Sequence, residues 1–192
     1  MLKSFSEIAK IIKEKRRAEG VRRDGEGRAI AELSVRDDSE FLSPYSVGTH
    51  EVIDGEVAEF IENVLQPIPY REHLCLRIYS NVIDEQERIR YTQAIRTYYG
   101  DRYESSVYEK KKLRLLSLIM GLIGVAALAA MILLNVFTEH EILAEVIDIF
   151  AWVFVWEAVD IAFLQCTLIG MKQKRYLALV DSVIEFYHRE EE

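Results

Sequence analysis

The feature that most constrains this chain is a pair of apolar runs separated by only the seven residues 135–141. The first run, Leu115 to Leu134, has twenty residues and no charge. About twenty apolar residues in a helix are needed to cross a bilayer core of roughly 30 Å. The first run therefore predicts a transmembrane helix.

The second run, Ile142 to Gly170, is long enough to span but contains four acids and no Lys or Arg. The acids are Glu145, Asp148, Glu157 and Asp160. Its Leu, Ile, Val and Phe residues favour insertion by roughly 5 to 9 kcal/mol in total, whereas one ionised Asp at the centre costs about 3 kcal/mol. The run is therefore marginal alone. Protonation of the acids, or insertion together with the first run, lowers this cost.

We therefore predict a transmembrane helical hairpin over residues 111–171, with spans of about 115–136 and 142–170. On a helical wheel the four acids share one half of the second span with Trp152 and Trp156. Small residues let helices approach closely in lipid, so we expect Gly121, Gly124 and Ala127 to pack against the two tryptophan rings. The acids should then face protein or water.

Basic residues stand at both outer ends of the predicted hairpin and are absent from its turn. They are Lys110, Lys111, Lys112 and Arg114 before the first span, and Lys172, Lys174 and Arg175 after the second. Under the positive-inside rule, this pattern places both termini in the cytoplasm. The expected location is the cell membrane, and the absence of organelle signals favours a prokaryotic inner membrane.

The preceding part, residues 1–110, predicts a small cytoplasmic α+β domain, which leaves the chain mostly α overall. Alternating apolar and polar residues predict strands over 29–35 and 73–79. Asp54 can cap one helix, and Asp84 can begin another that breaks at Gly100. A further helix from about Asp101 is expected to enter the membrane.

Two terminal segments carry helical apolar stripes. Leu2, Phe5, Ile8, Ala9 and Ile12 predict an amphipathic helix, which either packs on its own domain or, less favoured, lies on the anionic inner leaflet. Residues 172–192 predict a cytoplasmic helix followed by an acidic tail, because Tyr176 to Tyr187 keep a spacing of three and four.

The composition excludes several functions. Residues 1–114 have 20 Lys and Arg against 21 Asp and Glu, and residues 115–192 have 4 against 11. This balance argues against nucleic acid as a partner. Cys75 and Cys166 do not indicate a disulfide framework, and the His50-Glu51 and Glu72-His73 pairs lack metal-ligand spacing. We predict no catalytic residue, no metal, no cofactor and no enzymatic activity.

The sequence thus favours an integral membrane protein that serves as an interaction or sensor module. Its expected partners are the lipid bilayer and, through the hairpin, a second copy or another membrane protein. The alternative is a subunit of an oligomeric cation or proton channel, because intramembrane carboxylates often mark ion paths. Residues alone do not decide whether the acids hold helices together or line a path.

Overall fold

A computed structural model describes residues 21–48, 50–70, 72–137 and 141–189. They form two compact units: unit 1 comprises residues up to Asp101 together with those from Arg175, and unit 2 comprises Arg102 to Lys174. Helices form most of the part of the chain that the structure describes, which confirms the prediction of a mostly helical protein. The predicted N-terminal amphipathic helix and the acidic tail lie outside the described residues.

Unit 1 contains a three-stranded parallel sheet in the order β1 (Ala29–Ser34), β2 (Leu74–Tyr79), β3 (Val183–Tyr187). The first two strands confirm the predictions from alternation. Since all three strands are parallel, helical crossovers must join them, and unit 1 has α/β connections rather than the segregated elements of a predicted α+β domain.

The predicted C-terminal helix is confirmed up to Val180, and the third strand overturns the rest of it. Helix α5 (Cys166–Val180) ends at Val180, and the chain turns at Asp181 before pairing with β2. The apolar stripe at spacings of three and four fits a helix, but the segment after Val180 also suits a strand. Its Val, Ile, Phe and Tyr residues are strong strand formers, and Ile184 and Phe186 pack against the core of unit 1.

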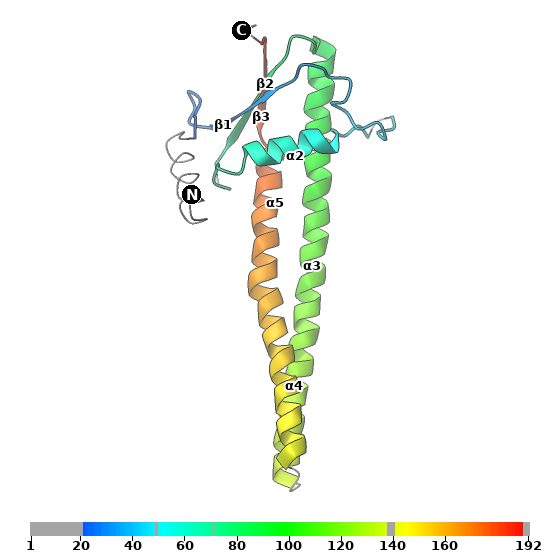
Figure 1. Cartoon of the computed structure of the whole chain (residues 1–192), viewed down its shortest axis with the longest axis vertical. Coiled ribbons are helices and arrows are strands. Elements are labelled where there is room, and N and C mark those ends of the chain that lie inside the picture. The colour runs from blue at the N-terminus through cyan, green and yellow to red at the C-terminus, as the bar shows by residue number, and fades with distance from the viewer. Residues whose placement is uncertain (1–20, 49, 71, 138–140, 190–192) are drawn as a thin grey trace, which may run out of the picture. The chain divides into compact units, whose positions relative to one another are not determined.

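Helix α2 (Gly55–Val64) provides the crossover from β1 to β2. The Asp54 side chain caps it as predicted, accepting a 2.8 Å hydrogen bond from the backbone N–H of Glu56. Its buried residues Ala58 and Ile61 join the core formed on the inner face of the sheet. In Figure 1, α2 lies across this face of the strands.

Helix α3 (Glu85–Phe137) is continuous for 53 residues, so the predicted break at Gly100 is wrong. Its predicted start is confirmed by a reciprocal capping box, in which the N–H of Glu87 and the N–H of Asp84 each donate a 2.8 Å bond to the other residue's carboxylate. An isolated glycine costs a helix only about 1 kcal/mol. The neighbouring Tyr99 is completely buried, and the packing around it outweighs that cost.

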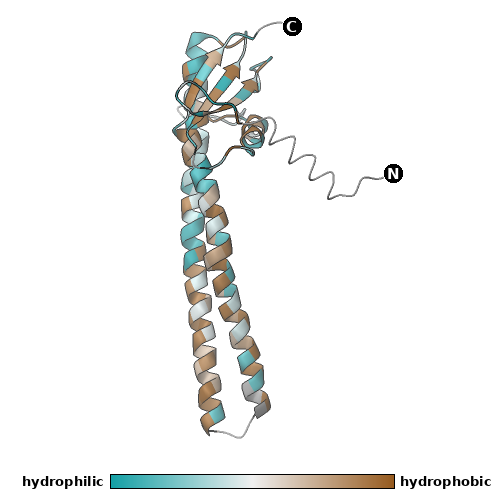
Figure 2. Cartoon of the chain, turned by 90° about the vertical axis from the view of Figure 1, so that its left-hand side faces the viewer, coloured by the Kyte–Doolittle hydropathy of each residue, from teal (hydrophilic) through white to brown (hydrophobic). Residues whose placement is uncertain are grey.

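In unit 2 the second half of α3 lies beside a returning segment made of α4 (Glu141–Asp160), the π-helical turn η1 (Ile161–Gln165) and the first part of α5. The Ser117 hydroxyl donates a 2.8 Å bond to the Ala158 carbonyl, and Lys110 contacts Gln173. These pairs run in opposite sequence directions, so the two segments are antiparallel. Apolar residues dominate both of them (Figure 2).

Among the described residues, only α3 is long and apolar enough to cross a membrane by length and composition. Just 6% of its most apolar window is buried within the protein. The returning segment fails the same criterion because of its acids. Within the described residues, this criterion thus supports one of the two predicted spans.

Candidate functional site

The helix contact of unit 2 and a pocket in unit 1 carry features beyond simple packing. The helix contact is closest at Gly124, which is buried. A Cβ built there would lie 2.7 Å from Val155 Cγ2 and 3.3 Å from the carbonyl oxygen of Ala151. At Gly121 a Cβ would lie 3.7 Å from that of Ala158, an ordinary contact. Of these two glycines, Gly124 is the one that requires a residue without a side chain.

The tryptophans do not occupy the place that the sequence predicted. Trp152 and Trp156 are 61% and 71% exposed, whereas Ala151 and Ala158 of the same helix are buried. Small residues thus face small residues across the contact, and the large rings point away from it. The prediction that the rings pack on Gly121, Gly124 and Ala127 is wrong, because close backbone approach leaves no room for an indole; Ala127 itself is half-buried.

The four acids of the returning segment separate into two pairs. Glu145 and Glu157 are exposed, while Asp148 and Asp160 are half-buried. Asp148 shares a helix face with the buried Ala151 and Ala158.

Asp160 immediately precedes the π-helical turn and accepts a 3.1 Å bond from the Gln165 side-chain amide. The wider π turn brings residues five apart onto one face, which explains this pair. The wheel drawn for a regular helix therefore misses it.

The basic residues predicted at the ends of the hairpin lie in both units and have different surroundings. Within unit 2, Lys110 reaches Gln173 and lies 3.0 Å from a Cβ built at Gly170, while Lys111, Lys112, Arg114, Lys172 and Lys174 are exposed. Arg175 belongs to unit 1, where its guanidinium donates a 2.8 Å bond to the Ile68 carbonyl and lies 4.6 Å from the centre of the Tyr70 ring. Desolvation by burial lowers the pKa of Arg175. Arg175 is thus a structural residue of unit 1.

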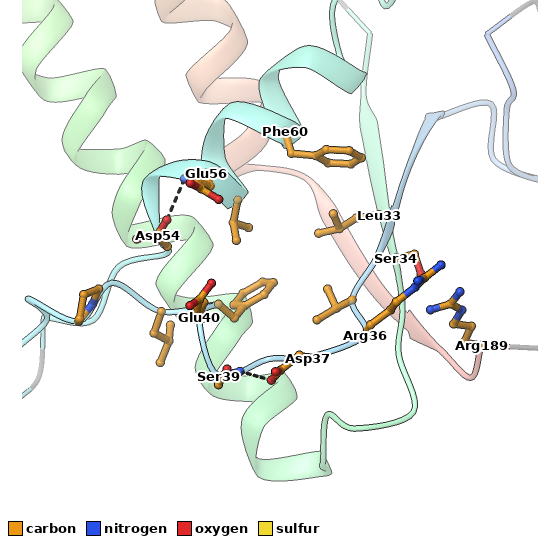
Figure 3. A pocket seen from close by; sticks show the side chains of 15 residues that line it. Leu33, Ser34, Arg36, Asp37, Ser39, Glu40, Asp54, Glu56, Phe60 and Arg189 are labelled. Atoms are coloured by element: carbon orange, nitrogen blue, oxygen red, sulfur yellow. Dashed lines mark hydrogen bonds between the residues drawn. The ribbon is translucent and has the colours of Figure 1, made fainter.

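The pocket of unit 1 was not predicted. It has a volume of about 980 Å³ and lies where β1 ends, against α2 and the loop that joins them. Figure 3 shows Arg36 and Arg189 beside each other at one end, and Glu40, Asp54 and Glu56 toward the other. Parallel sheets commonly bind ligands beyond the carboxyl ends of their strands. No sequence motif marks this pocket, because Arg189 reaches it only through the unforeseen strand β3.

Contacts with α3 hold the pocket loop in place. The Tyr91 hydroxyl donates a 2.9 Å bond to Asp38, and the Tyr91 ring stacks on Phe41 with 4.5 Å between centroids. Burial, followed by the bond to Asp38, raises the pKa of Tyr91. Arg90 makes two bonds to the Glu51 carboxylate and so lowers its pKa. The wall of the pocket is therefore fixed to a long helix.

The outer face of the sheet carries a polar cluster on neighbouring strands. Arg77 on β2 pairs with Glu185 on β3 at 3.2 Å, and Tyr187 donates a 2.9 Å bond to the same carboxylate. These bonds, led by the one from Tyr187, lower the pKa of Glu185. Burial raises the pKa of the Cys75 thiol, which disfavours the reactive thiolate. This cluster joins β2 to β3 rather than forming a reactive centre.

No group of three or more potential metal ligands occurs among the residues that the structure describes. No protein-family model, curated protein or solved structure matches the chain.

Proposed function

We propose that this chain is a two-span membrane protein whose unit 1 is a cytoplasmic interaction or sensor module, anchored and assembled through unit 2. The observation that carries the proposal is the exposed apolar surface of α3. Leu118, Leu122 and Val125 are each about 60% exposed. Contiguous apolar surface of this length is not sustained in water and suits a lipid environment.

The topology of the sheet supports a second crossing. Strands β2 and β3 pair directly, yet α3, α4 and α5 separate them along the chain. Both ends of the helical excursion must therefore reach the same side of any membrane. If α3 crosses once, the chain must cross back, and the returning segment is the one available between Phe137 and Val183.

The helix contacts support a shorter second span than 142–170. Ser117 and Gly121 both contact Ala158, so at equal helical rise Leu115 lies opposite about residue 161. A crossing matched to α3 then covers about 141–161, with its centre near Ala151. Only Asp148 lies near that centre, on the half-buried face, whereas Asp160 falls at the inner boundary, where the cost of a charge is smaller.

The exposed acids support assembly. Glu145 and Glu157 face away from the helix contact, and a carboxylate that faces lipid is costly, even when protonation reduces the penalty. A second copy or another membrane protein that covers this face removes that cost. The exposed rings of Trp152 and Trp156 provide apolar area beside the acids.

Topology can be tested by labelling introduced cysteines in intact cells, since both native cysteines are buried. An impermeant maleimide should label Thr138→Cys from outside, and should label Tyr45→Cys and Lys174→Cys only after lysis. Labelling of Thr138→Cys and Tyr45→Cys from the same side would contradict the two crossings.

Assembly can be tested by light scattering of the detergent-solubilised protein. We expect an oligomer that Glu157→Leu shifts toward monomer, while Phe163→Leu, at another exposed position, leaves it unchanged. A wild-type protein that stays monomeric at every concentration would contradict assembly through this face.

One observation favours a second candidate, conduction of cations or protons. The acids include exposed side chains on the returning helix, and no Lys or Arg lies between Leu115 and Gly170 to neutralise them. Several copies arranged around these acids would line a negative path. Protein in liposomes should then dissipate a cation gradient, and Glu157→Gln with Asp160→Asn should abolish the flux. Absence of flux in the wild type would exclude this candidate.

A further inference from the structure

We propose that the pocket of unit 1 binds a nucleoside monophosphate, with its phosphate at the Arg36–Arg189 end and its base, preferably guanine, toward Glu40 and Glu56. The pocket has the size range of small-ligand sites and lies at the carboxyl end of β1. This inference concerns unit 1 alone and does not depend on the membrane topology proposed above.

The phosphate end is defined by two arginines. Arg36 follows β1, and Arg189 follows β3, where its backbone is held by two bonds to the Asn81 side chain, of 2.8 and 3.1 Å. Five arginines of unit 1 form ion pairs with carboxylates: Arg22, Arg23, Arg28, Arg77 and Arg90. Neither Arg36 nor Arg189 does so with any described residue. Two adjacent guanidinium groups without an acidic partner suit a dianion such as phosphate.

The opposite end is acidic and suits hydrogen-bond donors. Asp54 accepts from the first turn of α2, and Asp37 accepts from the backbone N–H of Ser39, so both are already used within the protein. The carboxylates of Glu40 and Glu56 have no partner within the described part of the chain. Asp54 and Glu56 also occupy the start of α2, which disfavours a phosphate there and leaves the arginine end for it.

Apolar side chains from α2 and β1 also line the pocket. Phe60 on α2 is 49% exposed, and Figure 3 shows its ring directed toward Leu33 of β1. Val57 lines the same side. A flat ring system can pack on these side chains while its edge meets the carboxylates. Guanine presents adjacent ring N–H and amino donors, which match a carboxylate better than the single amino donor and ring acceptor of adenine.

The test uses isothermal titration of the full-length protein in detergent with guanosine monophosphate, adenosine monophosphate and inorganic phosphate as separate titrants. We expect saturable binding of guanosine monophosphate, weaker binding of adenosine monophosphate and still weaker binding of phosphate. The double substitution Arg36→Gln and Arg189→Gln should weaken the binding of guanosine monophosphate by at least about tenfold, because two charge-assisted contacts are lost.

Two further variants make the result specific. Glu56→Gln should reduce the preference for guanine over adenine. Arg22→Gln removes an exposed arginine outside the pocket and should leave the affinity for both nucleotides unchanged. Circular dichroism checks that each variant is folded. The inference is overturned if guanosine monophosphate does not bind, if the double variant binds it as well as the wild type does, or if phosphate alone binds equally well.

Discussion

The two units of this chain place their apolar residues in opposite positions. In unit 1, residues such as Ile78, Ile95 and Leu179 are almost completely enclosed, and the outer face of the sheet is polar. In unit 2, large apolar side chains such as Leu122 and Phe163 are exposed, and the enclosed residues are small, among them Ala151 and Gly124.

With unit 2 in a membrane, as proposed above, this contrast implies two different sources of stability. Water drives large apolar side chains into the core of unit 1 through the hydrophobic effect. Lipid offers no such driving force, so helices in a membrane depend on close packing, which favours small residues at the contact. Large apolar side chains are thus enclosed in the core of unit 1 and exposed on the surface of unit 2.

The largest expected effect comes from truncating the core of unit 1. Ile78→Ala removes a fully buried side chain from the central strand and should destabilise unit 1 by about 2 to 5 kcal/mol. Leu122→Ala in unit 2 removes a similar volume from an exposed position and should cost less than about 0.5 kcal/mol in detergent. Hydrogen exchange measured in each unit gives the loss of stability caused by each substitution. Equal losses would remove the distinction between the two units.

The next effect tests the opposite change in unit 2. Gly124→Leu places a side chain where even a Cβ would lie 2.7 Å from Val155, so it should cost about 1 to 3 kcal/mol and separate the helices. Gly121→Ala, with 3.7 Å available, is the matched control and should be tolerated. Trp152 and Trp156 lie only in unit 2, so tryptophan fluorescence during thermal unfolding reports the change there. Tolerance of leucine at 124 would argue against close packing as its source of stability.

A smaller effect is expected at the start of α3. Asp84→Ala removes one half of the capping box and should lower stability by about 1 kcal/mol, seen as faster hydrogen exchange in the first turn of the helix. Asp84→Asn retains a capping side chain and should keep most of the stability that Asp84→Ala loses. Because the cap belongs to unit 1, exchange within residues 115–137 should not change; a change there would indicate that the units unfold together.

The smallest effect concerns pH. Arg90 lowers the pKa of Glu51, so the contribution of this ion pair is present above the ordinary pKa of a glutamate and is lost as the pH falls through the lowered value. The melting temperature of unit 1 should therefore decline modestly below about pH 4.5. Glu51→Gln should have a lower melting temperature at pH 7 and a flatter decline. An identical pH dependence in both proteins would show that the pair contributes nothing measurable.

The sequence by itself determined the local features whose causes are close along the chain. Alternation predicted β1 and β2, Asp54 and Asp84 predicted helix starts, and the uncharged run from Leu115 predicted the candidate span in α3. Periodicity and capping act within a few residues, so a single sequence records them directly.

Only the tertiary structure decided the rest. The apolar spacing of residues 183–187 also fits a helix, yet they form a strand. They do so because β2, more than one hundred residues earlier in the chain, provides hydrogen bonds and core contacts. That same pairing brings Arg189 to the pocket that Arg36 also lines, and no local pattern marks this pocket. At Gly124, Val155 and the Ala151 carbonyl approach so closely that the tryptophan rings do not fit there. Contacts between distant segments depend on the whole fold, and local spacing does not encode them.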